Sequence, residues 1–313
     1  MALRSLSLLF VFSVAAFSIP FSHSIPFIVL HGINSECSRP EVQKTVEKLT
    51  NFSGVEGHCI EAGNGVSDSW LMPMHKQVEI VCQKVKELNI LREGYNIVGL
   101  SQGNIIARGV IEFCDGGPPV KNYISLAGPH AGVASVPKCG SGALCIIVDQ
   151  LIKSAVYSDF VQEHLAPSNY LKIPDAIHDY LDKCSFLPVL NNEYPSTRNS
   201  TYKERLSSLE NLVLIMFEND TVLIPKETSW FGYYPDGRFE PVLSPNQTKL
   251  YSEDWIGLRS LDEGRKVNFV SVRGEHLQIS DKDMQKYVAR YLNGNASTKS
   301  GNVKTVVSRK LGS

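Results

Sequence analysis

The chain contains short, continuous apolar runs, and each run ends in a glycine or a polar turn. Runs rich in Ile, Val and Leu, without polar alternation, are typical of strands that are buried on both faces of a parallel sheet. We therefore predict strands over residues 26–30, 95–100, 123–127, 212–217 and 267–272.

Between these runs, apolar residues recur at the three- and four-residue spacing of amphipathic helices. The spacing predicts helices over residues 78–88, 104–114 and 284–292, the last with Ser280 as its N-cap and Gly294 as its stop. Alternating strands and helices indicate an α/β fold, with a mostly parallel sheet and right-handed crossovers. In such sheets, reactive groups lie at the carboxyl ends of the strands, where the polar turns of this chain also fall.

One long segment, residues 132–210, interrupts the alternation. We interpret it as a largely helical insertion that lies over the carboxyl ends of the strands, between two parts of the core at 25–131 and 211–294. Its apolar stripe around residues 151–160 either only packs on the sheet or also lines a groove for an apolar substrate, and the sequence leaves both open. We interpret residues 295–313 as a flexible tail.

The first 24 residues have the layout of a secretory signal peptide. Arg4 is followed by an apolar run at 6–17, and serines occupy the positions one and three residues before a cleavage point at Ile25. The run is short for a membrane span, which needs about 20 residues, and this favours cleavage over an uncleaved signal anchor. We expect no transmembrane span after cleavage, and passage through the secretory pathway.

Composition narrows the possible classes further. The chain has 313 residues, with 31 basic and 32 acidic side chains and a formal net charge of −1. These values exclude a disordered polyelectrolyte, and no nucleic-acid partner is expected.

Passage through the secretory pathway bears on two further features, the glycosylation triplets and the cysteines. With a signal peptide, the five N-x-Ser/Thr triplets become candidate glycan sites, namely Asn51, Asn199, Asn219, Asn246 and Asn295. The seven cysteines would meet an oxidising compartment, where pairing is expected and at least one is left over. Their spacing fits no metal motif, so we predict no metal site and no cofactor.

The candidate catalytic motif is the pentapeptide from Gly99 to Gly103. It has the pattern G-x-S-x-G and lies between a predicted strand and a predicted helix. That context is typical of a nucleophile elbow, a tight turn that exposes the hydroxyl of Ser101 at a helix N-terminus. A serine hydroxyl needs a general base, and the expected chain order is serine, acid, histidine. His276, in the turn after the last predicted strand, is the predicted base. Asp220, after the 212–217 strand, is the predicted acid.

Alternatives exist for these roles. Glu218 is a rival acid, although we expect it to point to the other side or to lie within the strand, and Asp220 could merely cap a turn. His31 precedes Ser101 in the chain and is interpreted as structural, whereas His130 could line the site. A backbone N–H next to His31, with that of Gln102, could form an oxyanion hole.

With these motifs in place, the chain resembles the palmitoyl-protein thioesterase family, and within it the lysosomal branch that depalmitoylates proteins. The matching stretches span nearly the whole chain after residue 24 and are Leu30-His31-Gly32, Gly94-Tyr95-Asn96, Gly99-Leu100-Ser101-Gln102-Gly103, Asn219-Asp220 with Pro225, Trp230-Phe231-Gly232 and Gly274-Glu275-His276-Leu277-Gln278.

The resemblance implies an α/β-hydrolase fold and cleavage of long-chain acyl thioesters, such as S-palmitoyl-cysteine in proteins or peptides and palmitoyl-CoA. It implies that Ser101 is the nucleophile, Asp220 the acid and His276 the base, with the N–H groups of Ile33 and Gln102 as the oxyanion hole. It further implies two disulfides, Cys82–Cys114 and Cys139–Cys145. It also implies glycans at Asn199 and Asn219 and a lysosomal or vacuolar location.

Three departures from the family accompany the resemblance. Asn104 stands where the family often has glycine, the tail is an addition, and Cys59 and Cys184 have no implied partner. The pairing of Cys37 is also left open. Two other readings of the chain remain: a secreted lipase or carboxylesterase that acts on lipid oxyesters, and a hydrolase-fold binding protein without activity. Because His276 must be neutral to act as a base, activity should fall as the medium turns acidic.

Overall fold

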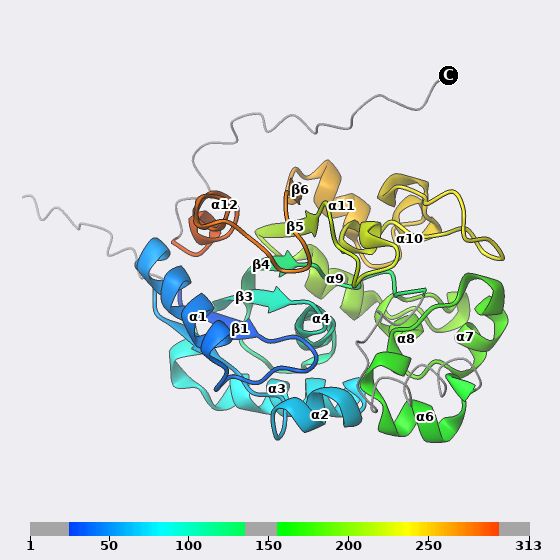
Figure 1. The fold of residues 1–313 in the computed structure, drawn as a ribbon, viewed down its shortest axis with the longest axis horizontal. Helices are drawn as coiled ribbons and strands as arrows, with labels where there is room; N and C mark the ends of the chain where they lie inside the picture. Colours follow the sequence, from blue (N-terminus) through cyan, green and yellow to red (C-terminus); the bar gives the residue numbers. More distant parts are fainter. Residues whose placement is uncertain (1–24, 135–154, 294–313) are drawn as a thin grey trace, which may run out of the picture.

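The computed structural model describes residues 25–134 and 155–293, and its centre is a single parallel sheet (Figure 1). Six strands pair in the order β2-β1-β3-β4-β5-β6, and every neighbouring pair is parallel. The strands are β1 Phe27–Leu30, β2 Gly57–Cys59, β3 Tyr95–Leu100, β4 Val120–Leu126, β5 Asn211–Phe217 and β6 Val267–Val272. The five predicted strands are confirmed, and β2 was not predicted.

Burial explains which strands the apolar runs revealed. All residues of β1 and β3 are buried, as are all but the first of β5, because helices cover both faces of the sheet. By contrast, β2 is a three-residue edge strand, Gly-His-Cys, and is only half-buried. It therefore has no apolar run that could have predicted it.

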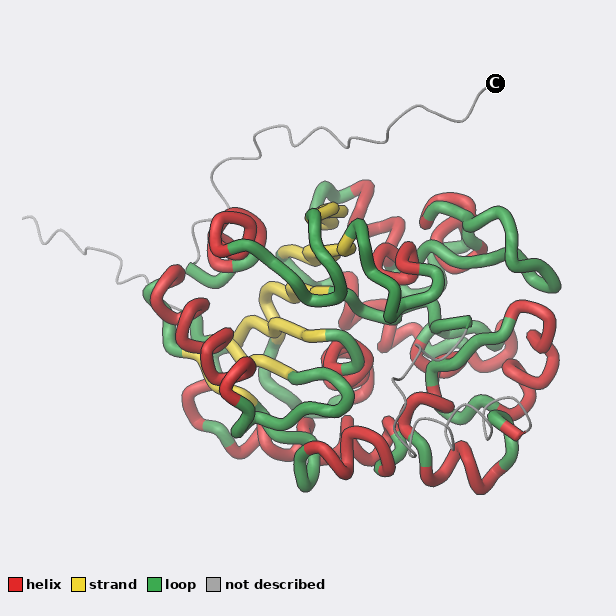
Figure 2. The backbone as a smooth tube through the Cα atoms, viewed as in Figure 1, coloured by secondary structure: helices red, strands yellow, loops and turns green. Residues whose placement is uncertain are grey.

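Helices form a layer on each face of the sheet (Figures 1 and 2). On one face α1 packs against α12, and on the other α3 packs beside α4, which in turn contacts α9. The α-helices of this core are α1 Pro40–Ser53, α2 Val66–Leu71, α3 Met74–Glu87, α4 Gly103–Phe113, α9 Ser200–Ser207, α10 Lys249–Ser252, α11 Leu258–Glu263 and α12 Asp281–Tyr287.

The predicted N-cap of the last helix is confirmed, since the hydroxyl of Ser280 accepts the N–H of Asp283 at 3.1 Å. The helix ends at Tyr287, earlier than predicted, and continues as a 3₁₀ turn. The 3₁₀ turns are η1 Asn89–Leu91, η2 Ala166–Asn169, η3 Pro174–Ala176, η4 Pro195–Thr197, η5 Lys226–Trp230, η6 Pro245–Gln247 and η7 Ala289–Tyr291.

The described part of the segment between β4 and β5 is helical and lies beyond the carboxyl ends of the strands (Figure 1). Before α9 it contains α6 Asp159–His164, α7 Ile177–Lys183 and α8 Leu187–Leu190. The exact limits of the insertion stay a prediction. The signal peptide at 1–24, the tail at 295–313, and the implied Cys139–Cys145 pair lie outside the described residues.

Two disulfides are present among the described residues. Cys82 and Cys114 join α3 to the end of α4, the pair that the family resemblance implies. Cys37 and Cys59 join the loop after β1 to the end of β2, a pairing that the sequence left open. Cys184 is buried and has no disulfide partner among the described residues, and burial raises the pKa of its thiol to about 12. No helix in the described ranges combines the length and apolarity that a bilayer crossing requires.

Candidate active site

Ser101 stands in a strained turn where β3 ends and α4 begins. Its φ is +51°, a left-handed backbone conformation that is costly for a residue with a side chain. The turn is also crowded. A Cβ on Gly99 would lie 2.2 Å from Oδ1 of Asn104, and one on Gly103 would lie 2.2 Å from the carbonyl oxygen of Leu30. Packing thus requires both glycines of the motif, and the turn presents the hydroxyl of Ser101 beyond the sheet edge.

Ser101, His276 and Asp220 form one hydrogen-bonded chain across the ends of three strands. Nε2 of His276 lies 2.9 Å from Oγ of Ser101, and Nδ1 lies 2.7 Å from Oδ2 of Asp220. An ionised carboxylate only accepts, so Nδ1 donates to Asp220 and Nε2 accepts the hydroxyl of Ser101. This tautomer leaves Nε2 ready to take the serine proton.

The second oxygen of Asp220 is also occupied. Oδ1 accepts the N–H groups of Val222 and Leu223 at 2.8 and 3.0 Å, so the residue caps a turn and holds His276 at the same time. Its side chain is fully buried. Glu218 is exposed and bonds Ser271 instead, which excludes it as the acid of this chain of hydrogen bonds.

The two N–H groups expected to form an oxyanion hole come from different loops that approach Ser101. A Cβ on Gly32 would lie 3.0 Å from Cβ of Ser101, so the Gly32–Ile33 peptide abuts Ser101. Gln102 directly follows Ser101 in the chain. Among the described residues, neither Ile33 N–H nor Gln102 N–H donates to a backbone carbonyl or a side chain. Both are therefore available to a ligand oxygen.

Ser69 of α2 links these two loops. Its hydroxyl accepts the N–H of Asn34 at 2.9 Å, and its carbonyl accepts Nε2 of Gln102 at 2.7 Å. The other end of the Gln102 side chain accepts the hydroxyl of Tyr170 at 2.8 Å. The side chain of Gln102 is buried, and its role in fixing the elbow was not predicted.

Asn104, the departure from the family pattern, also supports the elbow. Its amide donates to the carbonyl oxygens of Ser101 and Leu126 at 3.0 and 2.9 Å, and its oxygen accepts the hydroxyl of Tyr123 at 2.9 Å. The residue is fully buried. Since its oxygen occupies the space next to Gly99, Asn104 and that glycine fit one another.

Three other histidines follow Ser101 in the chain, and in the described residues none of them hydrogen-bonds Ser101 or Asp220. His130 is fully buried, bonds Oγ of Ser125 at 2.8 Å and stacks on Phe231, and burial holds its pKa well below the usual value. It therefore does not line the site as an available base. His164 and His178 are exposed in the insertion. The candidate glycan residues Asn199 and Asn219 are exposed, and glycosylation stays a prediction.

A buried ion pair that the sequence did not reveal anchors the elbow helix. Arg108 of α4 bonds Glu112 at 2.9 Å, Oδ1 of Asn191 at 2.7 Å and the carbonyl of Leu190 at 3.0 Å, with its guanidinium over the ring of Phe231. Both charged side chains are fully buried. Burial raises the pKa of Glu112 to about 7, although Arg108 opposes the shift. The pair ties α4 to the end of α8.

Two other features have some of the properties of ligand sites. His31, Cys37 and Glu61 place potential ligand atoms within 4.8 Å of one another, but the sulfur of Cys37 is bonded to Cys59 and is no thiolate. A cavity of about 480 Å³ opens between Phe231 and Trp255. None of Ser101, His276 and Asp220 is among the described residues that line it.

The parallel sheet, the serine elbow after β3 and the acid and histidine turns after β5 and β6 define an α/β-hydrolase fold. Within that class, the chain belongs to the palmitoyl protein thioesterase family, whose sequence profile matches residues 26–276.

Named relatives agree with this assignment. The chain is 37% identical to palmitoyl-protein thioesterase 1 of Caenorhabditis elegans over 262 residues, which covers 82% of this chain and 87% of that protein. It is 34% identical to palmitoyl-protein thioesterase 3 of Dictyostelium discoideum over 291 residues, 92% of this chain and 95% of that one. A lysosomal thioesterase PPT2 homolog of Drosophila melanogaster is 29% identical, over 78% of this chain and 83% of that protein. By name these relatives are thioesterases, which hydrolyse thioesters.

Proposed function

We propose that this protein is a serine hydrolase that cleaves long-chain fatty acyl thioesters, with Ser101 as nucleophile, His276 as base and Asp220 as the acid that orients it. The observation that carries the proposal is the hydrogen-bonded chain from Oγ of Ser101 through His276 to a buried carboxylate. A serine without such a base is a weak nucleophile, and this geometry is the standard means of activating it.

The reaction proceeds in two steps. Nε2 of His276 takes the proton of Ser101 as Oγ attacks the thioester carbonyl, and the oxyanion receives the N–H groups of Ile33 and Gln102. Collapse of the tetrahedral intermediate breaks the carbon–sulfur bond, and the imidazolium of His276 gives its proton to the departing sulfur, which leaves an acyl-serine. Water then gives a proton to His276 and attacks the acyl carbon. The second intermediate breaks the bond between the acyl carbon and Oγ, His276 returns the proton to Oγ, and the fatty acid is released. Asp220 stabilises the imidazolium in both steps.

The thioester preference is supported by family membership and is compatible with the site. A thiol has a pKa of about 8.5, so a thiolate leaves with little protonation and needs no further catalytic group. The substrates proposed are S-acylated proteins or peptides and acyl-CoA thioesters. The two disulfides and the relatives named lysosomal thioesterases support a secretory route that ends in a lysosome, in a vacuole or outside the cell.

The test compares palmitoyl-CoA with a palmitoyl oxyester of equal chain length, using the wild type and Ser101→Ala. The proposal predicts that the thioester is the better substrate by kcat/KM and that both activities disappear in the variant. Preference for the oxyester would move the protein to the lipases and carboxylesterases. If neither is turned over and a fluorophosphonate does not label Ser101, the proposal is wrong and a binding role replaces it.

A further inference from the structure

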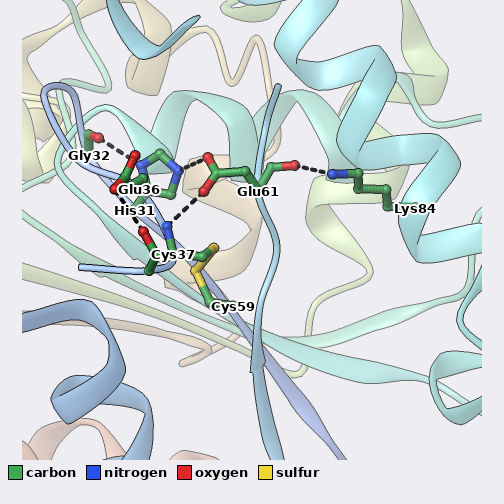
Figure 3. The surroundings of a disulfide bond; sticks show 8 residues. His31, Gly32, Glu36, Cys37, Cys59, Glu61 and Lys84 are labelled. Atoms are coloured by element: carbon green, nitrogen blue, oxygen red, sulfur yellow. Dashed lines mark hydrogen bonds and ion pairs between the residues drawn. A yellow bond between two sulfur atoms is a disulfide. The ribbon is translucent and has the colours of Figure 1, made fainter. Parts of the chain in front are cut away.

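One carboxylate holds both ends of the loop that carries Ile33, residues 31–37. Oε1 of Glu61 lies 2.6 Å from Nε2 of His31, where the loop begins, and Oε2 accepts the N–H of Cys37 at 2.7 Å, where it ends (Figure 3). Each oxygen thus has its own partner in the loop. An amide in the same place could accept at only one of the two positions.

Glu61 is itself fixed from the other side. It follows β2 by two residues, and its carbonyl oxygen accepts Nζ of Lys84 at 2.7 Å (Figure 3). The disulfide from Cys37 to Cys59 ties the same end of the loop to the last residue of β2. The loop is therefore attached to the end of β2 by one disulfide and by two charge-assisted hydrogen bonds to Glu61.

His31 transmits this anchoring to the peptide next to the nucleophile. Its Nδ1 lies 2.9 Å from the carbonyl oxygen of Gly32, while Nε2 faces Glu61. A carbonyl oxygen can only accept, so Nδ1 donates to the oxygen of Gly32. The carbonyl of Gly32 and the N–H of Ile33 belong to one planar trans peptide, and an N–H in such a unit points opposite to the carbonyl. Holding the oxygen of Gly32 therefore sets the direction of the N–H of Ile33.

We propose that Glu61 and His31 are positioning residues that orient the N–H of Ile33 toward the oxyanion. We call this chain of contacts the relay: Glu61, just after β2, holds His31, and His31 holds the Gly32–Ile33 peptide. The proposal rests on the proposed function, in which Ile33 supplies one of the two oxyanion donors. In the described part of the chain, neither residue hydrogen-bonds Ser101 or His276. Their contribution is expected in the transition state, where the oxyanion forms, and not in the binding of the acyl chain.

The test is steady-state kinetics on Glu61→Gln, His31→Ala and the double variant, with active sites counted by fluorophosphonate labelling. Complete loss of an oxyanion donor costs a factor of about 10²–10³ in kcat, so a misaimed donor should cost about 10- to 100-fold, with KM within about twofold. Because the two residues act in series, the double variant should be no slower than His31→Ala. His31→Asn, which keeps an amide donor near the oxygen of Gly32, should recover most of the loss.

Glu56→Gln is the matched control, since it removes an exposed carboxylate just before β2 that lies 3.3 Å from Nε2 of the half-buried His58. It should keep wild-type kinetics. A kcat of Glu61→Gln equal to that of the wild type, a loss confined to KM, or an equal loss in Glu56→Gln would overturn the relay. Thermal unfolding of each variant separates loss of fold from loss of rate, and His31→Asn supplies the answer should Glu61→Gln not fold.

Failure of the relay and failure of the proposed function have different signatures. Wild type and Ser101→Ala first establish whether the thioester or the oxyester is hydrolysed, and the variants are then compared on that substrate. Both substrates pass through an oxyanion, so the relay is tested even if the thioester preference is wrong. A wild type that neither turns over nor labels overturns both proposals.

Discussion

Removal of the Arg108 guanidinium is the sharpest test of how the elbow helix is held. Arg108→Met keeps an apolar side chain of similar length but removes the hydrogen bonds to Glu112, Asn191 and Leu190. The carboxylate of Glu112 would then be buried without a partner, since its second oxygen already has no hydrogen-bond partner among the described residues. This leaves an uncompensated charge between α4 and the insertion.

The expected cost follows from that burial. Breaking a fully buried ion pair by removing one partner typically costs about 3–5 kcal/mol, because the remaining charge has lost its water and gained nothing. At about 2–4 °C per kcal/mol for a large domain, Tm should fall by about 6–20 °C. Protonation of Glu112 relieves part of the cost, and burial already raises its pKa to about 7. The penalty should therefore be larger at pH 8 than at pH 5.

Urea unfolding of four proteins measures the effect: wild type, Arg108→Met, Glu112→Leu and the double variant. The double variant removes both charges and leaves apolar side chains, an exchange that is often close to neutral. It should therefore recover at least about 2 kcal/mol of the loss in Arg108→Met. A double variant that is as unstable as the single one would refute the reasoning, because the buried charge would then not be the cause.

Two further outcomes are expected. Asn104→Gly should lower the free energy of unfolding in urea by about 1–3 kcal/mol, because two buried hydrogen bonds from the side-chain amide are lost while each carbonyl keeps a backbone donor; an unchanged unfolding midpoint would contradict this. Burial raises the pKa of Glu112 in the folded protein from 4.5 to about 7, so its contribution to stability is present below pH 4.5 and is lost as pH rises through 7. Glu112→Gln should remove this pH-dependent difference, up to about 3 kcal/mol, and parallel stability curves for the two proteins would argue against it.

The long strands and the order of the site residues were predictable for one physical reason. Strands buried on both faces must be apolar throughout, so β3 and β5 are visible as runs, and each ends where the polar turns of the site begin. The choice between Asp220 and Glu218 also followed from the turn. Glu218 comes directly after the strand and bonds Ser271 on β6, whereas Asp220 turns back to His276.

The anchors of the site were not predictable in the same way, because a single charged residue carries no period. Arg108 and Glu112 are four apart on α4, a spacing that is usual for an exposed ion pair, and only tertiary packing buries them. The contact between Arg108 and Asn191 joins positions 83 residues apart. No local pattern contains that information.

The contact between Glu61 and His31 could have been predicted from the strand β2 and its register with β1. In the sheet β1 and β2 are parallel, and Val29 is paired with Cys59. His31 lies two residues after Val29, and Glu61 lies two residues after Cys59. The register of the three-residue strand therefore brings the imidazole of His31 next to the carboxylate of Glu61. The same register places Cys59 within reach of Cys37 in the loop after β1. The sequence did not predict β2, and for the same reason it left the pairing of Cys37 open and did not identify Glu61. A prediction of β2 with its register would have supplied all three, because in a parallel pair one matched position determines every later one.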